Sequence, residues 1–594
     1  MKEIWTIHNK RADFKRIGEM LNIDPVLVRI ARNRGILTDA EFEEYFKKDI
    51  KSLHSPYLLK DVEKGADLLI EAIRLKKKIR IVGDYDNDGI QSTYILYKAL
   101  QNIDATVDYV IPDRIKDGYG LNPAIIETAV TDKVDFILTC DNGIAADEAI
   151  ALARTNNMTV VVTDHHEVPY REDIDGSRFY KLPYANAIID PKREDCNYPF
   201  KELCGAAVAW KFLMVVYEKA CQDVSKLNEF IENVAFATVC DVMDLIGENR
   251  VLVSWGLNAI HNTHNIGLKA LMRVNGLEME NISAYHFGFI LGPCMNATGR
   301  LETAYQGVEL LLCKDIEKAN ELAEHLYDLN AERKYLTEIA LGAAIEQVEN
   351  SSWKNQKVYV VYIPDCHESI CGIVAGKLRE RYNRPSIVLS DGERCVKGSG
   401  RSIEKYSMFE ELTKCNDLFL GFGGHPMAAG MSLTQENIGK LREQLNKNCT
   451  LTDDDILPHV EIDLNLPFYY ISEDFVNGLS LLEPFGKANS KPNFVEKHVK
   501  IKSMQRIGKE KDTLKFLLYS SDGTFFPALL FHGAEQFISD VVLSCGTKEE
   551  HEMSVNNFNH IELDIIFYPQ INIFNNNKSL QLIISHYRVH PIAG

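Results

Sequence analysis

Three aspartates stand at alternate positions in residues 81–93, IVGDYDNDGIQST. Asp84, Asp86 and Asp88 follow a short run of β-branched residues that is typical of a buried strand. Alternate residues of an extended chain share one face, so three carboxylates there would repel one another unless a cation neutralised them. Because hard divalent cations prefer oxygen ligands, this spacing predicts a metal site.

Two other interpretations fit the same segment. An EF-hand calcium loop has the pattern D-x-D-x-D-G, but it needs a Glu at loop position 12, where this sequence has Ile95. It also needs a helix before the loop, and here a strand pattern precedes it. The EF-hand is therefore excluded, and the second alternative is a set of surface acids that solvate a turn.

Polar side chains also follow two further strand patterns. Asp141 comes directly after VDFILTC, and Asp164, His165 and His166 come directly after MTVVVT. Taken alone, Asp141 is typical of a turn-capping residue, and a pair of histidines is often structural. The carboxyl ends of parallel strands, however, form the crevice in which open α/β sheets bind ligands. Three such strand ends therefore favour one shared site over three unrelated turns.

The strand patterns between residues 78 and 190 alternate with amphipathic helix patterns. This alternation predicts a parallel sheet covered on both faces, which is a doubly wound α/β domain. Helical patterns follow at 204–221 and 226–243, and a long one runs from 315 to about 350. The length of the last helix suits a connection between two domains.

A second, smaller α/β pattern occupies residues 358–433, and from about residue 456 short strands separated by turns predict a small barrel of OB type. A chain of 594 residues exceeds the roughly 250 to 300 residues at which single cores stop growing. We therefore predict four parts: an N-terminal extension (1–60), an α/β domain with a helical insert and the start of the linker helix (61–330), a smaller α/β domain (331–455) and an OB-like barrel (456–594).

The composition is that of a soluble globular protein, with 45% hydrophobic and 25% charged residues. The first twenty residues lack the apolar stretch of a signal peptide, and no window approaches the roughly 18 apolar residues of a membrane span. We therefore expect a cytoplasmic protein without membrane contact. The 13 cysteines include no C-x-x-C pair, so neither a disulfide framework nor a zinc site is expected.

The net charge of −19 argues at first against a nucleic-acid partner, because Lys and Arg drive phosphate binding. Basic residues nevertheless cluster at Lys377, Arg379, Arg381 and Arg384, and again at Lys397 and Arg401. An acidic body with a basic channel therefore remains open. For the first cluster, a solvated helix face is the alternative.

The motifs DYDNDG, DNG and Asp164-His165-His166, in this order and spacing, resemble the first three motifs of the DHH phosphoesterase family. The fourth motif, an aspartate after a helix, is matched by Asp241 in ATVCDVMDLIGENR. The resemblance implies a site for two Mn²⁺ or Mg²⁺ ions and places His166 near the phosphate. It assigns Asp84 and Asp86 to one ion, Asp88, His165 and Asp241 to the other, and Asp141 as the bridge.

Further segments resemble the RecJ-type exonucleases of this family. They are IPDRIKDGYGL (111–121), PKREDCNYPFKELCG (191–205), DLIGENR (244–250) and GPCMNATGRL (292–301). By this resemblance Asn296 and Arg300 lie close to the metal site and help to hold phosphate, for which the planar Arg side chain is suited.

The second α/β domain resembles the DHHA1 module in CHESICGIVAGKL, KGSGRS and GFGGHPMAAG, and LLEPFGKANSKPNF resembles the entry to the RecJ OB domain. The resemblance implies that Ser399 and Arg401, with Arg114, bind a 5′-terminal phosphate, and that Tyr119 stacks on a base. The implied nucleic-acid-binding residues are Arg114, Tyr119, His367, Ser399, Arg401, Gly424 and His425. A tight turn is the alternative at residues 423–425, and a packed aromatic is the alternative for Tyr119.

The function implied by this resemblance is a single-stranded-DNA-specific 5′-to-3′ exonuclease of DNA repair and recombination. Two ions about 3.5 to 4 Å apart would activate a water and clamp the scissile phosphate, releasing mononucleotides. A monomer is expected, with single-stranded DNA, a single-strand-binding protein and a helicase as partners.

Two rival functions come from different classes. A small-substrate DHH phosphodiesterase acting on short oligonucleotides or cyclic dinucleotides would be compact, and the β-rich residues 456–594 argue against it. A catalytically silent DNA-binding scaffold would have lost metal ligands, and every expected ligand is present here.

Overall fold

The computed structural model describes residues 3–114, 117–173, 177–545, 558, 561–574 and 577–591. The chain divides into two compact units, of which one spans residues 53–458 and the other combines residues 3–52 with 459–594. None of the helices described is both long enough and apolar enough to cross a bilayer.

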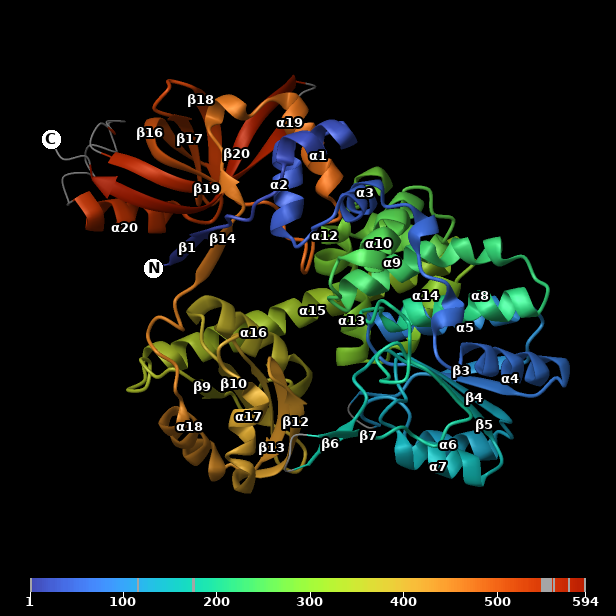
Figure 1. Ribbon diagram of the computed structural model, residues 1–594. Helices are drawn as coiled ribbons and strands as arrows, with labels where there is room; N and C mark the ends of the chain where they lie inside the picture. Colours follow the sequence, from blue (N-terminus) through green and yellow to red (C-terminus); the bar gives the residue numbers. More distant parts are fainter. Residues whose placement is uncertain are drawn as a thin grey trace. The chain divides into compact units, whose positions relative to one another are not determined.

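A five-stranded parallel sheet with the order β3-β2-β4-β5-β8 forms the core of the first α/β domain in the larger unit (Figure 1). The neighbours of β2 are the next two strands of the chain, one on each side, so the direction of winding reverses at β2. Ligands of such sheets bind at this switch point. The strands are β2 (Ile79–Val82), β3 (Val107–Val110), β4 (Phe136–Cys140), β5 (Thr159–Thr163) and β8 (Ala187–Ile189).

Helices cover both faces of this sheet, as predicted. Alternate strand residues enter two separate cores: Ile81 belongs to the core shared with α4, α5 and α8, and Val82 to the core shared with α6 and α7. Burial on both faces explains why the strands read as continuous apolar runs. The helices are α4 (Val62–Arg74), α5 (Asn87–Gln101), α6 (Pro123–Thr131), α7 (Asp147–Thr155) and α8 (Gly205–Lys219).

A helical part follows and ends in the predicted linker helix, α15 (Ile316–Glu349), which runs into the second α/β domain (Figure 1). Asp315 caps α15 by accepting from the backbone N–H of Lys318 at 2.9 Å. A π-helical turn at Phe287–Leu291 precedes α13. The other helices here are α9 (Ile231–Cys240), α10 (Gly247–Ile260), α11 (Ile266–Val274), α12 (Ala284–His286), α13 (Gly292–Leu301) and α14 (Tyr305–Leu312).

The second α/β domain has a mixed sheet with the order β12-β13-β11-β10-β9. Helices α15 and α16 share a core with one face of it, and α17 and α18 share a core with the other. Its elements are β9 (Tyr359–Tyr362), α16 (Cys371–Tyr382), β10 (Ser386–Asp391), β11 (Val396–Arg401), α17 (Met408–Thr413), β12 (Phe419–His425), β13 (Ala428–Leu433) and α18 (Asn437–Asn448).

A hairpin of β6 (Tyr170–Glu172) and β7 (Arg178–Tyr180) lies between β5 and β8 in the chain.

The other unit contains the predicted barrel, which closes because β16 pairs with both β17 and β19. Its elements are β14 (His459–Ile462), β15 (Leu464–Asn465), α19 (Glu473–Gly478), β16 (Phe494–Ile507), β17 (Thr513–Tyr519), β18 (Phe525–Leu530), α20 (Ala534–Cys545), β19 (Ile561–Phe574) and β20 (Asn577–Pro591). The N-terminal residues belong to this unit, since β1 (Ile4–Ile7) pairs in parallel with β14. Helices α1 (Phe14–Leu21), α2 (Pro25–Asn33) and α3 (Asp39–Lys47) add side chains to the barrel core.

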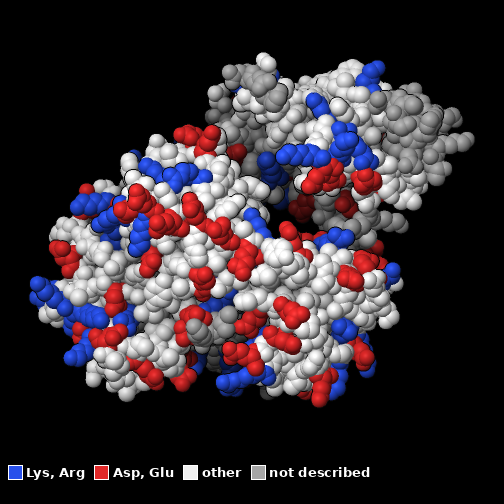
Figure 2. All heavy atoms as spheres, turned by 180° about the vertical axis from the view of Figure 1, so that it is seen from behind, with Lys and Arg blue, Asp and Glu red and all other residues white. Residues whose placement is uncertain are grey.

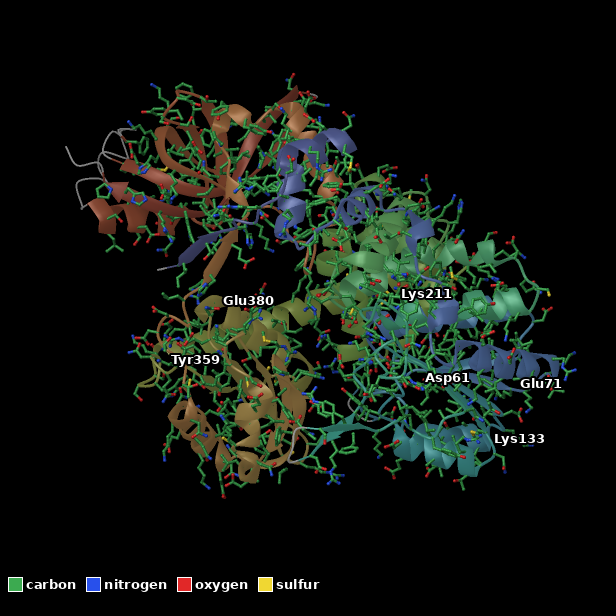
Figure 3. The ribbon with its side chains drawn as sticks, in the orientation of Figure 1. Asp61, Glu71, Lys133, Lys211, Tyr359 and Glu380 are labelled. Carbon is green, nitrogen blue, oxygen red and sulfur yellow. The ribbon has the colours of Figure 1, made fainter. Side chains whose placement is uncertain are left out.

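A buried ion pair between Lys211, labelled in Figure 3, and Glu248 fixes α8 against α10 in the larger unit. Lys211 Nζ lies 2.9 Å from Glu248 Oε1, and the two side chains are only 1% and 4% exposed. Lys211 also donates to the His54 carbonyl at 3.1 Å, and Tyr198 Oη donates to Glu248 Oε2 at 2.6 Å. Both charges are therefore satisfied, and the pair holds the helix whose first turn enters the site described below.

Replacing Lys211 by Met should lower the free energy of unfolding by about 3 to 5 kcal/mol, because the Glu248 carboxylate would stay buried without its counterion. The matched control is Lys219→Met at the end of the same helix. Lys219 pairs with the exposed Asp67 at 2.7 Å, and loss of such a surface pair changes stability by less than about 1 kcal/mol. Urea midpoints followed by circular dichroism compare the two variants, and equal shifts would contradict the role given to Lys211.

Candidate active site

The first two carboxylates of the site lie between β2 and α5. Asp84 is 2% exposed, and Asp86 is the N-cap of α5, where its Oδ1 accepts from the N–H groups of Asp88 and Gly89 at 2.9 and 3.1 Å. The expectation that Asp88 continues the extended chain is wrong. Because Asp86 caps α5, the helix begins at Asn87, one residue before Asp88, and Asp88 lies in its first turn.

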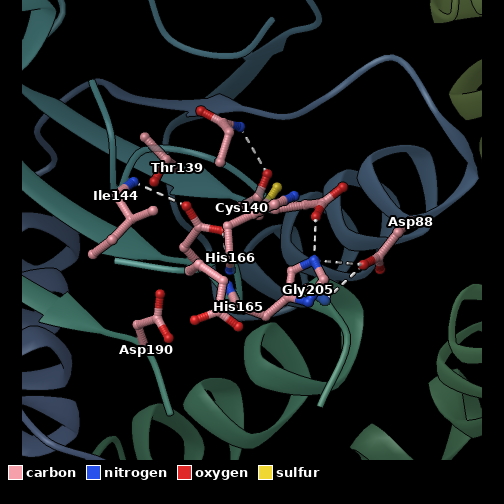
Figure 4. A network of polar contacts seen from close by, with 12 residues as sticks. Asp88, Thr139, Cys140, Ile144, His165, His166, Asp190 and Gly205 are labelled. Carbon is pink, nitrogen blue, oxygen red and sulfur yellow. Dashed lines mark hydrogen bonds and ion pairs between the residues drawn. The ribbon is translucent and has the colours of Figure 1, made fainter. Parts of the chain in front are cut away.

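Asp88 is held by the first turn of another helix, α8 (Figure 4). Its carboxylate accepts from the backbone N–H groups of Gly205 at 2.6 Å and Ala206 at 2.8 Å, where the helix dipole favours negative charge. A Cβ on Gly205 would lie 2.6 Å from the Cβ of Asp141, so only glycine permits this approach. Sequence reasoning missed Gly205, whose signal was its place at the start of a strongly apolar helix pattern.

Asp141 follows the end of β4, and His165 follows the end of β5. Both side chains lie beside these carboxylates. Asp141 has a φ of 61°, and its Oδ1 lies 3.0 Å from His165 Nε2. The same imidazole nitrogen lies 3.7 Å from both Asp88 Oδ2 and Asp241 Oδ2. Asp241 reaches this point from the end of α9. His165 is therefore surrounded by three carboxylates.

The structure brings all six predicted metal ligands together. Within each of three groups, one ligand atom per residue lies within 4.8 Å of the others: Asp84, Asp86 and Asp141; Asp88, His165 and Asp241; Asp141, His165 and His166. Asp141 and His165 each belong to two of these groups, and Asp141 Oδ1 lies 3.0 Å from His165 Nε2, so these two residues connect the groups.

The electrostatics of these groups favour a bound cation. Burial, followed by repulsion from Asp88 and Asp86, raises the pKa of Asp141 and of Asp241 well above the ordinary range. Burial and repulsion from Asp86 do the same for the pKa of Asp84, whereas Arg114 opposes this rise.

The donor set fits a hard divalent ion. Burial lowers the pKa of His165 to about 4, so its imidazole is neutral and can be a ligand. Asp84 Oδ1 and His165 Nδ1 are buried, and neither has a hydrogen-bond partner among the residues that the structure describes. Carboxylate oxygens with one imidazole suit Mn²⁺ or Mg²⁺.

His166 sits beside the carboxylate group with a different partner. Its Nδ1 lies 2.7 Å from Asp164 Oδ1. Asp164 is 1% exposed, and its Oδ2 accepts from the Ile144 N–H at 2.9 Å. Burial is the largest single influence and would lower the pKa of His166, but the bond to Asp164 and the negative charges of Asp164, Asp241 and Asp88 together outweigh it and raise that pKa to about 9. His166 is therefore an imidazolium at neutral pH. Asp164 was not among the predicted site residues, although its position directly before His165 was the signal.

Tyr119 lies at the same edge. Its hydroxyl donates to the Asp141 carbonyl at 2.8 Å and lies 3.1 Å from His166 Nε2. The residue is 49% exposed, so the hydroxyl is anchored while part of the ring remains accessible to a base.

Asn296 and Arg300 come from α13. Asn296 Oδ1 accepts from the Asn87 N–H at 2.7 Å, and Arg300 Nη1 donates to the Ser369 carbonyl of the second α/β domain at 2.7 Å. Burial lowers the pKa of Arg300 to about 10, and repulsion from Arg114 adds to this effect. The Arg114 guanidinium itself lies 4.9 Å from the ring centroid of Tyr85. The charges of these arginines and of the carboxylates act on one another, since Arg114 lowers the pKa of Asp84 and Asp86 raises the pKa of Arg300.

The predicted residues of the second domain fall into two places. Arg401 is half-buried, and its Nη1 donates to Ser399 Oγ at 3.0 Å and to the Gly400 carbonyl at 2.8 Å. His367 begins the turn before α16 and bonds Ser369 Oγ at 2.7 Å. Gly424 and His425 are exposed at the end of β12, two strands from Arg401 in the sheet. The structure therefore does not bring these two residues into the buried guanidinium group.

On the face shown in Figure 2, acidic and basic side chains of the described residues are interspersed. In the first basic cluster, Arg379 pairs with Glu380 at 2.9 Å, and Arg384 donates to the Tyr359 hydroxyl at 2.8 Å. These two arginines bind groups of their own domain, which favours the interpretation of the cluster as a solvated helix face. The basic groups that concern the site are half-buried or buried.

Comparisons with known proteins fit this arrangement. The model of the DHH family N-terminal domain matches residues 78–238, that of the DHHA1 domain residues 355–450, and that of the RecJ OB domain residues 462–586. The single-stranded-DNA-specific exonuclease RecJ of Escherichia coli (strain K12) is 31% identical over 589 residues, covering 95% of this chain and 96% of that protein. The chain belongs to the RecJ family. RecJ of Bacillus subtilis (strain 168) is 33% identical over 585 residues, covering 98% of this chain and 70% of that protein.

One solved RecJ structure is similar to nearly the whole chain, and another to about two thirds of it. RecJ of Thermus thermophilus in complex with Mn²⁺ has a TM-score of 0.80 at 25% identity, covering 98% of this chain and 79% of that one. An exonuclease RecJ bound to manganese has a TM-score of 0.57 at 30% identity, covering 67% of this chain and 96% of that one. The predicted RecJ membership and the order of α/β domain, linker helix, smaller α/β domain and barrel are confirmed.

Replacing Asp141 by Asn should raise the melting temperature of the metal-free protein, since one of several repelling buried carboxylates is neutralised. In wild type, Mn²⁺ at about 100 times its Kd should add about 2.7 kcal/mol of stability, and the variant should lose most of this gain. Thermal shifts in EDTA and in Mn²⁺ measure both effects.

Asp67→Asn is the control, because the Asp67 side chain is 66% exposed on α4. It should respond to Mn²⁺ as wild type does. A variant at Asp141 that keeps the full Mn²⁺ response would contradict its assignment as a ligand.

Proposed function

We propose that this chain is a single-stranded-DNA-specific 5′-to-3′ exonuclease that releases mononucleotides. The observation that carries the proposal is the assembly of a carboxylate and histidine group suited to divalent cations. The charges of this group and of Arg114 and Arg300, which suit phosphate, act on one another: Arg114 lowers the pKa of Asp84, and Asp86 raises the pKa of Arg300. Relatives along nearly the whole chain that are described as single-stranded-DNA-specific exonucleases support it.

Asp84, Asp86 and Asp141 would hold one Mn²⁺ or Mg²⁺ ion. Asp88, His165 and Asp241 would hold a second, with Asp141 shared between them. When bound, such ions lower the pKa of a water and neutralise charge on the scissile phosphate.

The chain's own residues bind and orient that phosphate. The side-chain oxygen of Asn296 accepts from the Asn87 N–H, so the side-chain NH₂ group of Asn296 can donate to the phosphate. Arg300 offers further guanidinium N–H groups beyond the one that Ser369 accepts. His166, protonated and oriented by Asp164, would donate from Nε2 to a phosphate oxygen. These donors fix the phosphate against the carboxylate group.

Polarity and strand preference would come from the second domain and from Tyr119. Arg401, Ser399 and Arg114 would bind the 5′-terminal phosphate through charge-assisted hydrogen bonds. Tyr119 would stack on a base, which requires that base to be unpaired and tolerates any sequence. His367, Gly424 and His425 would contact the strand further along, and the OB barrel would bind single-stranded DNA as such folds do.

We also propose that the enzyme works as a monomer in the cytoplasm during DNA repair and recombination. There a helicase and a single-strand-binding protein would supply its substrate. This part depends on the substrate class rather than on any contact in the chain.

The test is digestion of a 5′-phosphorylated single strand, a duplex and a dinucleotide in Mn²⁺. Mononucleotides should appear from the 5′ end of the single strand, while the duplex resists. Asp86→Ala and Asp141→Ala should each reduce turnover by more than about 100-fold, since even the loss of an outer partner of a metal ligand can cost that much.

Asp67→Ala, which removes an exposed carboxylate of the same domain, should digest at the wild-type rate. Retained activity in the Asp86 or Asp141 variant would contradict the proposed site. Products from the dinucleotide alone would instead indicate a small-substrate phosphodiesterase.

A further inference from the structure

An additional arginine, Arg333 of the linker helix α15, is connected through Asn330 to Cys294 on α13, the helix that carries Arg300. Its Nε and Nη2 both donate to Asn330 Oδ1, at 3.1 and 2.9 Å. Asn330 lies nearly one turn earlier on the same helix, is 2% exposed, and its Nδ2 donates to Cys294 Sγ at 3.3 Å. The buried amide therefore fixes the direction of the half-buried Arg333 side chain.

Arg333 belongs to a set of like charges. Burial is the largest influence on Arg300, and Arg114, Arg333 and Arg401 each lower its pKa further by repulsion. In the part of the chain that the structure describes, Arg300, Arg333 and Arg401 donate to neutral oxygens of Ser369, Asn330, Ser399 and Gly400. Half-buried guanidinium groups that lack carboxylate partners call for an anion from outside the chain.

A solvated helix face is the bland alternative for an arginine on α15. Lys334, the next residue, fits that description because it is exposed. Arg333 differs, since two of its nitrogens are committed to one buried amide and burial lowers its pKa. A side chain that only contacted solvent would not need two hydrogen bonds to a buried amide.

The number of charges indicates how many phosphates the group can take. A 5′-terminal phosphate carries about −1.5 to −2 at neutral pH, and each internal diester carries one negative charge. One terminal phosphate and one scissile diester therefore leave the four guanidinium groups of Arg114, Arg300, Arg333 and Arg401 short of full neutralisation. A second diester of the same strand would bring the phosphate charge to about −3.5 to −4, close to the four positive charges.

We propose that Arg333 binds an internal phosphodiester of the single strand next to the scissile one, and that Asn330 is the positioning residue that aims it. This rests on the proposed exonuclease function and deepens it, because it assigns a phosphate contact to the helix that connects the two α/β domains. The contact is distinct from the terminal-phosphate residues Arg114, Ser399 and Arg401.

The first test compares Arg333→Gln with Lys334→Gln, which removes the same charge one residue away. With a 5′-phosphorylated single strand in Mn²⁺, Arg333→Gln should raise KM about 10-fold and change kcat less than about 2-fold, as expected for a lost charged hydrogen bond. The slope of log(kcat/KM) against log[salt] should become less steep by about 0.7, the contribution of one phosphate of a single strand. Lys334→Gln should match wild type in both.

Two further measurements distinguish loss of the positive charge from disturbance of the fold: the variant Arg333→Lys and a modified substrate. The Lys variant keeps the charge and should recover the salt slope. Substrates with a neutral methylphosphonate at one internal linkage should cost wild type about 10-fold in kcat/KM at the contacted position, and should cost Arg333→Gln nothing more there.

The inference is overturned if Arg333→Gln behaves as Lys334→Gln does, or if methylphosphonates cost both proteins equally at every linkage. Failure of wild type to digest single strands would overturn the proposed function instead, so the two failures are distinguishable. Urea midpoints of each variant guard against unfolding: a KM change that follows the midpoint rather than the charge also counts against the role of Arg333.

Discussion

Repulsion among buried carboxylates is the constraint on which the rest of the larger unit depends. Five aspartates converge within a few ångströms, and burial makes their charges more costly still. The chain offsets part of this with backbone N–H groups from the first turns of α5 and α8, and leaves the remainder for cations. The guanidinium group beside it has the opposite requirement. A complex of divalent ions and a phosphate strand satisfies both sets at once, so the substrate and its metal ions complete the electrostatics of the fold.

The architecture follows from the need to assemble these groups from distant parts of the chain. Because β2, β4 and β5 are parallel, their carboxyl ends lie at one edge, next to the winding reversal at β2, and this brings Asp84, Asp141 and His165 together. Two helices contribute by their ends, since α8 presents its first N–H groups to Asp88 and α9 delivers Asp241. The close approach of α8 depends on Gly205 and on the buried Lys211 and Glu248 pair. Packing far from the chemistry thus sets ligand positions within it.

Local patterns predicted much of this and failed where long-range contacts decide. Strand ends, α15 and the closed barrel carry strong periodic signals, so they could be predicted. Asp88 was misplaced because alternate spacing fits both an extended chain and a helix start, and only the Asp86 cap distinguishes them. The pairing of β1 with β14 joins Ile4 to His459, and no local pattern encodes such a contact. Arg333 resembled any arginine of an amphipathic helix until Asn330 and its charged neighbours were seen around it.

The most direct test of the central claim is an anomalous diffraction measurement at the manganese edge on crystals grown with Mn²⁺. The electrostatics described here predict two strong peaks, one among Asp84, Asp86 and Asp141 and one among Asp88, His165 and Asp241, with Asp141 in contact with both. A map without peaks among these residues, or with its strongest peaks elsewhere in the chain, would contradict the view that their repulsion is resolved by metal ions.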